Sequence, residues 1–443
     1  QLVELAMVAR DAAGVFGVKG FLKSVARDSE TTMLKKVKDK WKPASVEIAL
    51  VYSIRLMKDL ERKEQKLNGK RIYDMAVLNE MEIINIDDMK TKREKKKHAP
   101  LILLNQCLDR VMEFVDLSSD DQQSIGSTLN RLRHLIFLKV KLKLMTAALE
   151  QSRCRHNSRF RIHLDRYEAA QSRERGTVTP HNSKCCFVQS FKQMYHTIER
   201  EVLRGADRMF EVGWKGVANE AGIDAGGPYR EALNEVARDC SSEHFDLFIR
   251  CKNGVFERGL NRDRFVPNPK YTSPLHLQMF EFAGVWMGIS FRTRANLPFV
   301  LPSIVWKPLV GETLTLDDLA SIDIEVSITI DQIKTLNTKE EFEAAFPDLY
   351  FTGKCINKLE LIPGGATKKV SFESRGKYVQ LLEEYHLGLY SQQVKAICRG
   401  FGTIVPSQLM RLFTWEEADI LTCGSPTINL IDLKKHTTYS GFT

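Results

Sequence analysis

A change of pattern near QSRERGTVTPHNS, residues 171–183, limits what this chain can fold into. Before it the sequence is helical in pattern. After it, helical stretches alternate with β-like segments such as VSITI (326–330) and KKVSFES (368–374), separated by tight Gly/Pro turns. The 443 residues are also too many for one ordinary hydrophobic core. We therefore predict an all-α region followed by an α+β domain.

The all-α part divides at a basic run. Residues 1–88 are mostly helical in pattern, and VEIALVYSIRLMKDLERKEQKL places Val46, Leu50 and Ile54 near one helix face. In KTKREKKKHAP six Lys and Arg residues face a single Glu, which predicts an exposed linker over 89–100. A nuclear-localisation signal is an alternative interpretation of KREKKK. A second helical region and its boundary follow over 101–180.

The composition limits which cellular compartments and which classes of partner are expected. Nine cysteines without a CxxC pair indicate a reducing compartment, and we expect a cytoplasmic location, with the nucleus as a second one. The formal net charge of +9 admits acidic partners. It does not favour nucleic acid, because no basic stripe is interleaved with aromatic residues. The sequence contains no stretch of 18 apolar residues, so it predicts no membrane-spanning helix.

A zinc site is the one metal centre that the residue types suggest. Cys154, His156 and His163 lie close together in RCRHNSRFRIH. Zinc needs about four ligands, and no second Cys/His cluster with finger spacing follows. The sequence therefore predicts neither a metal site nor a cofactor.

The most informative motif lies in MFEVGWKGVANEAGIDAGGPYREALNEVARDC, residues 209–240. A β-like segment over 210–214 precedes a glycine-rich turn and an apolar-periodic helix. Asp224 can accept backbone N–H bonds where the helix starts, and Gly226 and Gly227 permit a close approach of the chain. Phosphate binding is an alternative, but GIDAGG matches neither of the common phosphate-loop patterns.

This stretch resembles the opening of the HECT domain of ubiquitin ligases, in which D-x-G-G-x-x-R-E recurs. The pattern's residues here are Asp224, Gly226, Gly227, Arg230 and Glu231. Four further segments resemble the family in the right order: GVFERGLNRDRFVPNP (254–269), the helix and W-K-x-L-x-G region (276–323), the L-x-P-G-G region (359–387) and the P-x-x-L to L-x-C-G region (404–441). In the last, Ala418 departs from the family's E-L pair. GPYREA and NRDRFVPNP look closest to the large HERC-type branch.

The resemblance implies a fold and partners. Residues 181–443 would form a HECT-like N-lobe, mainly α-helical with a small β-hairpin subdomain. In this family a ubiquitin-conjugating enzyme docks on the N-lobe, and ubiquitin passes through a C-lobe cysteine thioester to a substrate lysine. The docking subdomain would span about 324–366. Its candidate contact residues, which would equally suit the core of a small unit, are Ile333, Leu336, Phe342, Leu349, Tyr350 and Phe351.

The role of Cys423 determines whether this chain contains the nucleophile. The family's thioester cysteine lies in a T-C-F-like motif that this chain lacks, whereas Cys423 falls in the L-x-C-G segment of the N-lobe. It also ends an apolar helix and precedes Gly424, a place suited to a packed thiol. We therefore expect Cys423 to be structural, the nucleophile to lie beyond Thr443, and the chain alone to be inactive.

Two other functions stay open at this point. The first is a catalytically dead binding module that sequesters a conjugating enzyme or a substrate. The second is an unrelated helical scaffold or nucleic-acid binder, suggested by the basic charge and by KREKKK.

Overall fold

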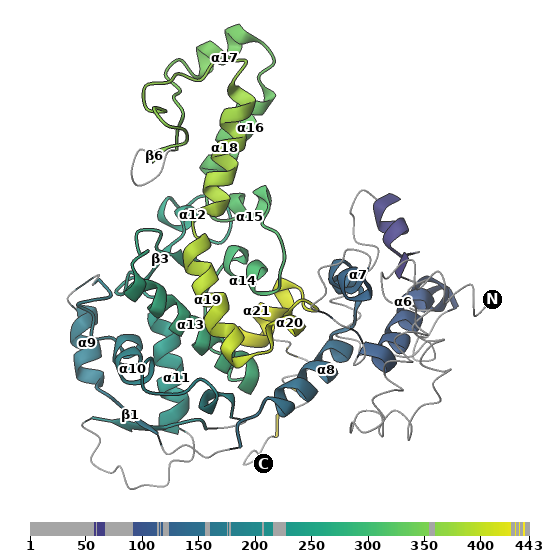
Figure 1. Ribbon diagram of the computed structural model, residues 1–443, viewed down its shortest axis with the longest axis vertical. Helices are drawn as coiled ribbons and strands as arrows, with labels where there is room; N and C mark the ends of the chain where they lie inside the picture. Colours follow the sequence, from purple (N-terminus) through teal and green to yellow (C-terminus); the bar gives the residue numbers. More distant parts are fainter. Residues whose placement is uncertain are drawn as a thin grey trace. The chain divides into compact units, whose positions relative to one another are not determined.

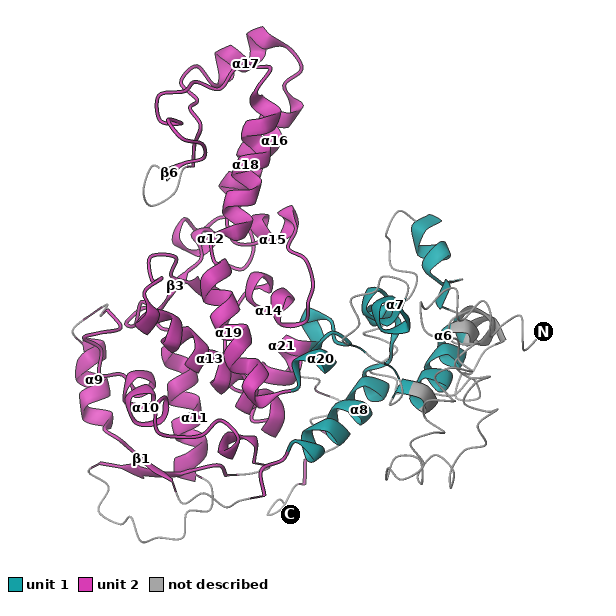
Figure 2. Cartoon of the chain, in the orientation of Figure 1, with its two compact units in different colours: residues 1–152, 406–417 teal, residues 153–405, 418–443 magenta. Residues whose placement is uncertain are grey.

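The computed structural model describes residues 57–66 and 92–426, with gaps, and four residues near the C-terminus. The gaps are residue 59 and residues 113–114, 116, 118–123, 156–159, 175, 177–178, 206–207, 216–226 and 354–358; the four residues are 430, 434, 437 and 438. The chain divides into two compact units, drawn in two colours in Figure 2. Unit 1 comprises residues 1–152 and 406–417, and unit 2 comprises residues 153–405 and 418–443. No helix in the described part is long and apolar enough to cross a membrane.

The regular elements in the described part of unit 1 are all helices. Its elements are α6 (Lys92–Val111), α7 (Ile125–Arg131), η3 (Arg133–Leu135), α8 (Leu138–Gln151), α20 (Ser407–Met410) and the first residues of α21 (Trp415–Cys423). The predicted linker over 89–100 differs from this, because α6 begins at Lys92. The helix continues into the buried residues Leu101 and Leu104, and burial of that apolar stretch outweighs the local charge.

A buried asparagine joins α6 to the turn before α8. The Asn105 amide donates to the Leu135 carbonyl at 2.9 Å, and its oxygen accepts from the Phe137 backbone N–H at 2.6 Å. Both donor and acceptor capacity of the side chain are thereby used, as a fully buried amide requires.

Among its described residues, unit 2 holds three two-stranded sheets together with its helices (Figure 1). In chain order its first elements are β1 (Arg161–Leu164), α9 (Arg166–Glu174), α10 (Cys186–Met194), η4 (Val202–Arg204), β2 (Glu211–Trp214), α11 (Gly227–Asp239), β3 (Phe248–Arg250), α12 (Lys252–Val255), β4 (Phe265–Pro267) and α13 (Pro274–Thr293). Then follow α14 (Ser303–Leu309), α15 (Leu316–Ala320), α16 (Ile324–Thr335), α17 (Lys339–Ala345), β5 (Thr352–Gly353), β6 (Leu359–Glu360), α18 (Arg375–Gly388), α19 (Ser391–Ile404) and the end of α21. The predicted α+β class, mainly helical with a small β part, is confirmed.

Strand pairing explains where unit 2 begins. Strand β1 pairs in parallel with β2, with Arg161 opposite Glu211 and Leu164 opposite Trp214. The Arg161 guanidinium also donates to the Glu211 carboxylate at 2.6 Å. Residues after 152 are therefore built into this unit, whereas the sequence placed the boundary at 180. The other sheets, β3–β4 and β5–β6, are antiparallel.

Helices α13 and α19 cross at backbone contact in the centre of unit 2. A Cβ added to Gly284 would lie 2.0 Å from the Ile397 carbonyl oxygen, and one added to Gly400 would lie 1.8 Å from that of Glu281. Each helix therefore contributes one glycine at which the partner's backbone takes the space of a side chain. The fully buried Trp286 of α13 adds a large aromatic surface to the same core.

The small subdomain has a helix where the sequence predicted a strand. VSITI lies inside α16, because the Asp323 side chain accepts the Val326 backbone N–H and caps the helix start. Val326, Ile330 and Ile333 then recur at helical spacing on the buried face. Of KKVSFES, only Lys369 forms a β-bridge, to Tyr350, and a turn over 371–374 follows.

Candidate functional site

The signature glutamate connects three elements of unit 2. Glu231, on α11, forms an ion pair with Arg166 of α9, and the Arg166 guanidinium lies 4.2 Å from the centre of the Trp214 ring on β2. Gly227 begins α11, and Arg230 is exposed. Asp224 and Gly226 lie outside the described residues. Of the described signature residues, Glu231 therefore links α11 to α9, and Arg166 in turn contacts β2.

The W-K-x-L-x-G region sets the start of the small subdomain. Asp318 accepts from Lys307 Nζ at 2.6 Å, from Ser303 Oγ at 2.7 Å and from the Thr315 backbone N–H at 2.8 Å. Burial opposes ionisation of Asp318, but the Lys307 and Ser303 bonds outweigh it and lower its pKa. This charge network fixes α15 against α14, one turn before the chain passes into α16.

The small subdomain has a hydrophobic core of its own, and α16, α17 and α18 extend together from the rest of unit 2 (Figure 1). Its core residues are Leu319, Val326, Ile330, Ile333, Phe342, Phe351, Val370, Tyr378, Val379 and Leu382. Three of the six candidate contact residues, Ile333, Phe342 and Phe351, are among them and are at most 2% exposed. A partner cannot reach these three side chains while the core of the subdomain stays packed.

Of the other three candidates, Leu336 and Leu349 pack against that core. Leu336, Leu349 and Tyr350 are half-buried. Sequence reasoning missed Phe346, Leu361 and Ile362, which are also half-buried and pack on the same core. We call these six half-buried residues the apolar rim: Leu336, Phe346, Leu349, Tyr350, Leu361 and Ile362. Phe346 lies one helical turn after Phe342, and that spacing is the signal that could have identified it.

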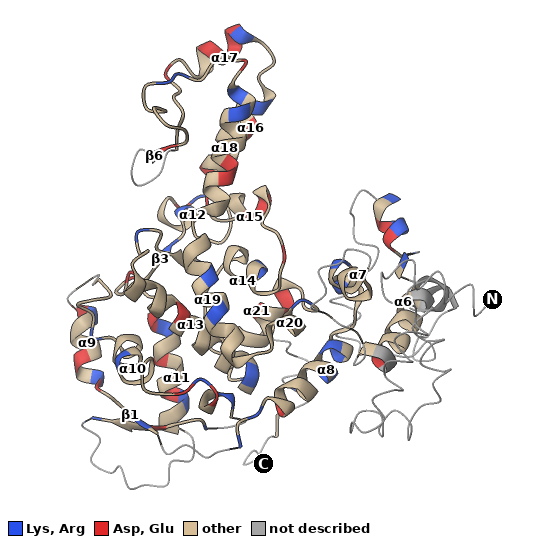
Figure 3. Ribbon diagram, in the orientation of Figure 1, with Lys and Arg blue, Asp and Glu red and all other residues tan. Residues whose placement is uncertain are grey.

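Phe372 is left out of the apolar rim because it is covered. The Arg375 guanidinium lies 3.6 Å from the centre of its ring. Figure 3 shows that acidic and basic residues both occur in α17 and in its neighbours in the small subdomain. The small subdomain therefore carries the apolar rim together with charges of both signs, and protein interfaces likewise combine an apolar centre with a polar periphery.

Backbone hydrogen bonds hold most of the rim in one layer. The Val370 N–H donates to the Leu349 carbonyl at 2.8 Å, and the Leu361 N–H donates to the Phe351 carbonyl at 2.9 Å. Residues 349–353 therefore have neighbouring segments on both sides. Leu349, Tyr350, Leu361 and Ile362 are brought together by this pairing, although about ten residues separate them in the sequence.

The L-x-P-G-G turn shapes the edge of this layer. The Glu360 carboxylate accepts the backbone N–H groups of Gly364, at 3.0 Å, and Ala366, at 3.2 Å. Gly364 has a φ of +73°, which side chains rarely allow. A Cβ at Gly365 would lie 2.3 Å from the Phe351 carbonyl oxygen. Both glycines are therefore required by the backbone of the layer.

Residues 235–443 match the family model described as HECT-domain (ubiquitin-transferase). Residues 235–443 belong to the HECT family. The chain is 33% identical over 282 residues to the E3 ubiquitin-protein ligase HERC2 of both Mus musculus and Homo sapiens, covering 63% of this chain and 6% of each relative. It is 24% identical over 441 residues to the probable E3 ubiquitin-protein ligase HECTD4 of Homo sapiens, covering 91% of this chain and 11% of the relative.

These comparisons confirm the HECT resemblance, and HERC2 agrees with the predicted HERC-type branch. The chain spans about a tenth or less of the length of these relatives. The alignment with HECTD4 also extends the similarity beyond the HECT match, into the residues before 235.

Cys423 lies at the end of α21 in the HECT region, half-buried against another segment. Its Sγ is 3.4 Å from the Phe299 carbonyl oxygen. Burial raises the pKa of the thiol, and the neighbouring Asp419 carboxylate raises it further. Asp419 in turn lies 3.6 Å from Arg264. These surroundings disfavour the thiolate that a nucleophilic cysteine needs.

Other described cysteines share this property. Burial is the largest influence at each of the five, and it raises their pKa above the ordinary value: Cys185, Cys186, Cys240, Cys251 and Cys398. Cys355 lies outside the described residues, as does His156 of the zinc alternative. Among the described residues no group of three or more His, Cys, Asp or Glu could hold a metal ion.

Proposed function

We propose that this chain is part of a HECT-type ubiquitin-protein ligase and that its small subdomain docks a ubiquitin-conjugating enzyme through the apolar rim. One observation carries the proposal. Within a HECT sequence match, a subdomain with its own hydrophobic core leaves six apolar side chains half-buried at its surface. Backbone hydrogen bonds hold four of them in one layer: Leu349, Tyr350, Leu361 and Ile362. Apolar anchors of this kind, surrounded by polar groups, supply most of the binding energy at protein interfaces.

The docking role assigns positioning, not bond chemistry, to the described residues. In the proposed reaction a ligase cysteine attacks the thioester between ubiquitin and the conjugating enzyme, and the enzyme's thiolate leaves. A substrate lysine amine then attacks the new thioester, so that an isopeptide bond forms and the ligase thiolate leaves. Holding the two thiols close together replaces a bimolecular encounter with an intramolecular one. The raised pKa of Cys423 supports a structural role for it in this scheme.

A binding measurement tests the docking site. Affinity for a panel of ubiquitin-conjugating enzymes would be measured by calorimetry with the whole chain and with two variants. Ile362→Ser changes the rim, and we expect it to weaken binding by roughly tenfold. Ile328→Ser is the matched control, because Ile328 is 48% exposed on α16 of the same subdomain but outside the rim. Equal losses in both variants would contradict the assignment.

A charging assay tests the role of Cys423. The chain would be incubated with activating enzyme, conjugating enzyme, ubiquitin and ATP and analysed with and without reductant. We expect no reductant-sensitive adduct on Cys423. An adduct lost in Cys423→Ala would overturn the structural role. A chain that docks the enzyme without accepting ubiquitin would also sequester it, and its addition would slow a reaction that contains an intact HECT ligase.

A further inference from the structure

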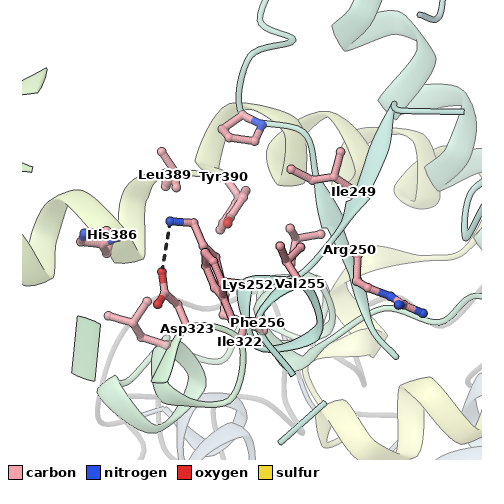
Figure 4. Close-up of a pocket in the computed structure, with 13 residues that line it drawn as sticks. Ile249, Arg250, Lys252, Val255, Phe256, Ile322, Asp323, His386, Leu389 and Tyr390 are labelled. Atoms are coloured by element: carbon pink, nitrogen blue, oxygen red, sulfur yellow. Dashed lines mark ion pairs between the residues drawn. The ribbon is translucent and has the colours of Figure 1, made fainter. Parts of the chain in front are cut away.

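A pocket of about 180 Å³ lies in unit 2 where the chain passes into and out of the small subdomain (Figure 4). Ile322 and Asp323 line it just before α16, and His386 and Leu389 line it where α18 ends. The remaining walls come from β3, α12, β4 and the residues that follow them, together with Leu319 of α15 and Tyr390 after α18. Both crossings of the chain therefore form part of one cavity.

The pocket is mostly apolar, and its charged or polar lining residues are Arg250, Lys252, Asp323, His386 and Tyr390. Arg250 pairs with Glu243, which does not line the pocket, at 3.3 Å. Lys252 and Asp323 form a loose ion pair at 3.8 Å, marked by the dashed line in Figure 4. His386 is only 4% exposed, and its Nε2 has no hydrogen-bond partner in the protein. A buried polar atom without a partner is unfavourable, so a ligand that forms a hydrogen bond with His386 Nε2 removes that cost.

Charge restricts what the pocket can accept. Burial, with a smaller effect of Lys252, lowers the pKa of His386 to about 4, so the imidazole is neutral at pH 7. A carboxylate ligand would be brought beside Asp323, and an ammonium ligand beside Lys252. Either ion would also lose its hydration among apolar walls. An uncharged ligand with one hydrogen-bonding group fits these constraints.

Size restricts the ligand further. An apolar protein cavity of about 150 Å³ accommodates benzene, and this pocket is slightly larger. Phe256 and Tyr390 supply aromatic walls for a ring to pack against. A ring with a hydroxyl can either donate to Nε2 or accept from it, whichever tautomer His386 adopts.

We propose that this pocket binds a single uncharged aromatic ring with one hydroxyl group, the chemistry of phenol, and that the hydroxyl bonds His386. The ring would be either a free small phenol or the side chain of a tyrosine that a partner presents. Its occupancy would hold together the two segments at which the chain crosses into the small subdomain. The proposal does not depend on the docking function.

The first test uses the unmodified chain. Binding of 4-fluorophenol and of 4-fluorotoluene would be titrated by fluorine NMR, because the pair differs in the hydroxyl and hardly in shape. One hydrogen bond to a buried group corresponds to roughly 3- to 10-fold tighter binding of the phenol. Equal affinity for the two probes, or no saturable binding, would overturn the proposal.

Variants locate the binding. Val255 is 61% exposed at the edge of the pocket, and Val255→Trp should fill the opening and abolish binding of both probes. Tyr167→Ser is the control, because Tyr167 is 74% exposed on α9 and does not line the pocket. His386→Leu should remove the preference for the phenol. If His386→Leu fails to fold, the comparison of the two probes on the unmodified chain still tests whether the hydroxyl contributes to binding.

Competition separates the two sources of the ring. N-acetyltyrosinamide carries the same phenol on a peptide-like backbone. Its displacement of bound 4-fluorophenol at similar concentration would support a partner's tyrosine. Failure to displace a phenol that itself binds would support a free small phenol. Unchanged phenol binding in Val255→Trp would contradict both.

Discussion

Lys141 and Glu417 form an ion pair of 2.6 Å between Nζ and Oε2, although the Lys141 side chain is fully buried. The two residues belong to unit 1, Lys141 on α8 and Glu417 near the start of α21, 276 positions apart. Glu417 also accepts the Thr414 backbone N–H at 2.9 Å, and Lys141 Nζ lies 5.9 Å from the centre of the Phe413 ring. A buried ammonium needs such partners, so this pair holds the 406–417 segment on α8.

Glu417→Gln should destabilise unit 1 more than Lys141→Met does. The first change leaves the buried ammonium without its carboxylate, at a cost of about 3 kcal/mol. The second removes the charge and keeps an apolar side chain of similar length. Hydrogen exchange of the α8 amides in the whole chain measures the effect.

The same helix offers a matched control for that pair. Lys143 pairs with Asp109 at 2.8 Å, but both side chains are exposed. Asp109→Asn should therefore change the α8 exchange free energy by less than about 1 kcal/mol. Equal effects of Asp109→Asn and Glu417→Gln would show that burial of Lys141 does not matter.

Gly284→Ala and Gly400→Ala should each destabilise unit 2 strongly. Either methyl group would meet a carbonyl oxygen of the opposite helix at 2.0 Å or less, and both helices would have to separate. We expect a loss of about 2–3 kcal/mol, typical of overpacking in a well-packed core. Thermal unfolding of the whole chain monitors it.

Gly376→Ala is the control for the two crossing glycines. Gly376 lies in helix α18, and nothing would be within 4 Å of an added Cβ. Because alanine favours helix, this variant should be neutral or more stable by up to about 1 kcal/mol. A drop in stability as large as that of Gly284→Ala would indicate a backbone effect, not a steric one.

Much of the fold could be predicted from motifs that occur in the family's order along the sequence. Local periodicity gave the wrong secondary structure where burial in the core determines it. The strand predicted over 210–214 is β2, from Glu211 to Trp214. VSITI is helical instead. Its β-branched residues favour a strand only weakly, and the cap at Asp323 together with core contacts at Ile330 decides the outcome. The linker predicted from charge over 89–100 was likewise wrong, because a helix starts at Lys92.

The candidate site was predictable only as a segment. The sequence does not reveal which apolar side chains face inward. The buried Ile333 and Phe351 were therefore predicted as contact residues together with the half-buried Leu349. Leu361 and Ile362 were missed because they reach the rim through backbone pairing of two segments, which the apolar pattern of the sequence does not reveal. The His386 pocket left no sequence signal, since its walls come from four separate stretches.

Acid should destabilise unit 2 through His386. Its folded-state pKa of about 4 lies below the ordinary value of 6.5, so the unfolded chain binds the proton more tightly. The stabilisation is therefore complete above pH 6.5 and is lost as the pH falls to about 4. The expected loss is about 2 kcal/mol by pH 5. The thermal midpoint should fall less between pH 7.5 and 5 in His386→Leu than in the unmodified chain, and equal shifts would refute the assignment.

Cys423 should react slowly with alkylating reagents in the folded chain. Burial and Asp419 both raise its pKa, so at pH 8 little thiolate is present. Iodoacetamide labelling, followed by mass spectrometry of the Cys423 peptide, should be at least roughly tenfold slower in the folded chain than in the same chain in denaturant. Asp419→Asn removes the nearby negative charge and should accelerate the folded-state reaction, whereas Asp109→Asn, a change in unit 1, should not. Equal rates in the folded and denatured chains would mean that Cys423 is an accessible thiol, and its structural role would then have to be abandoned.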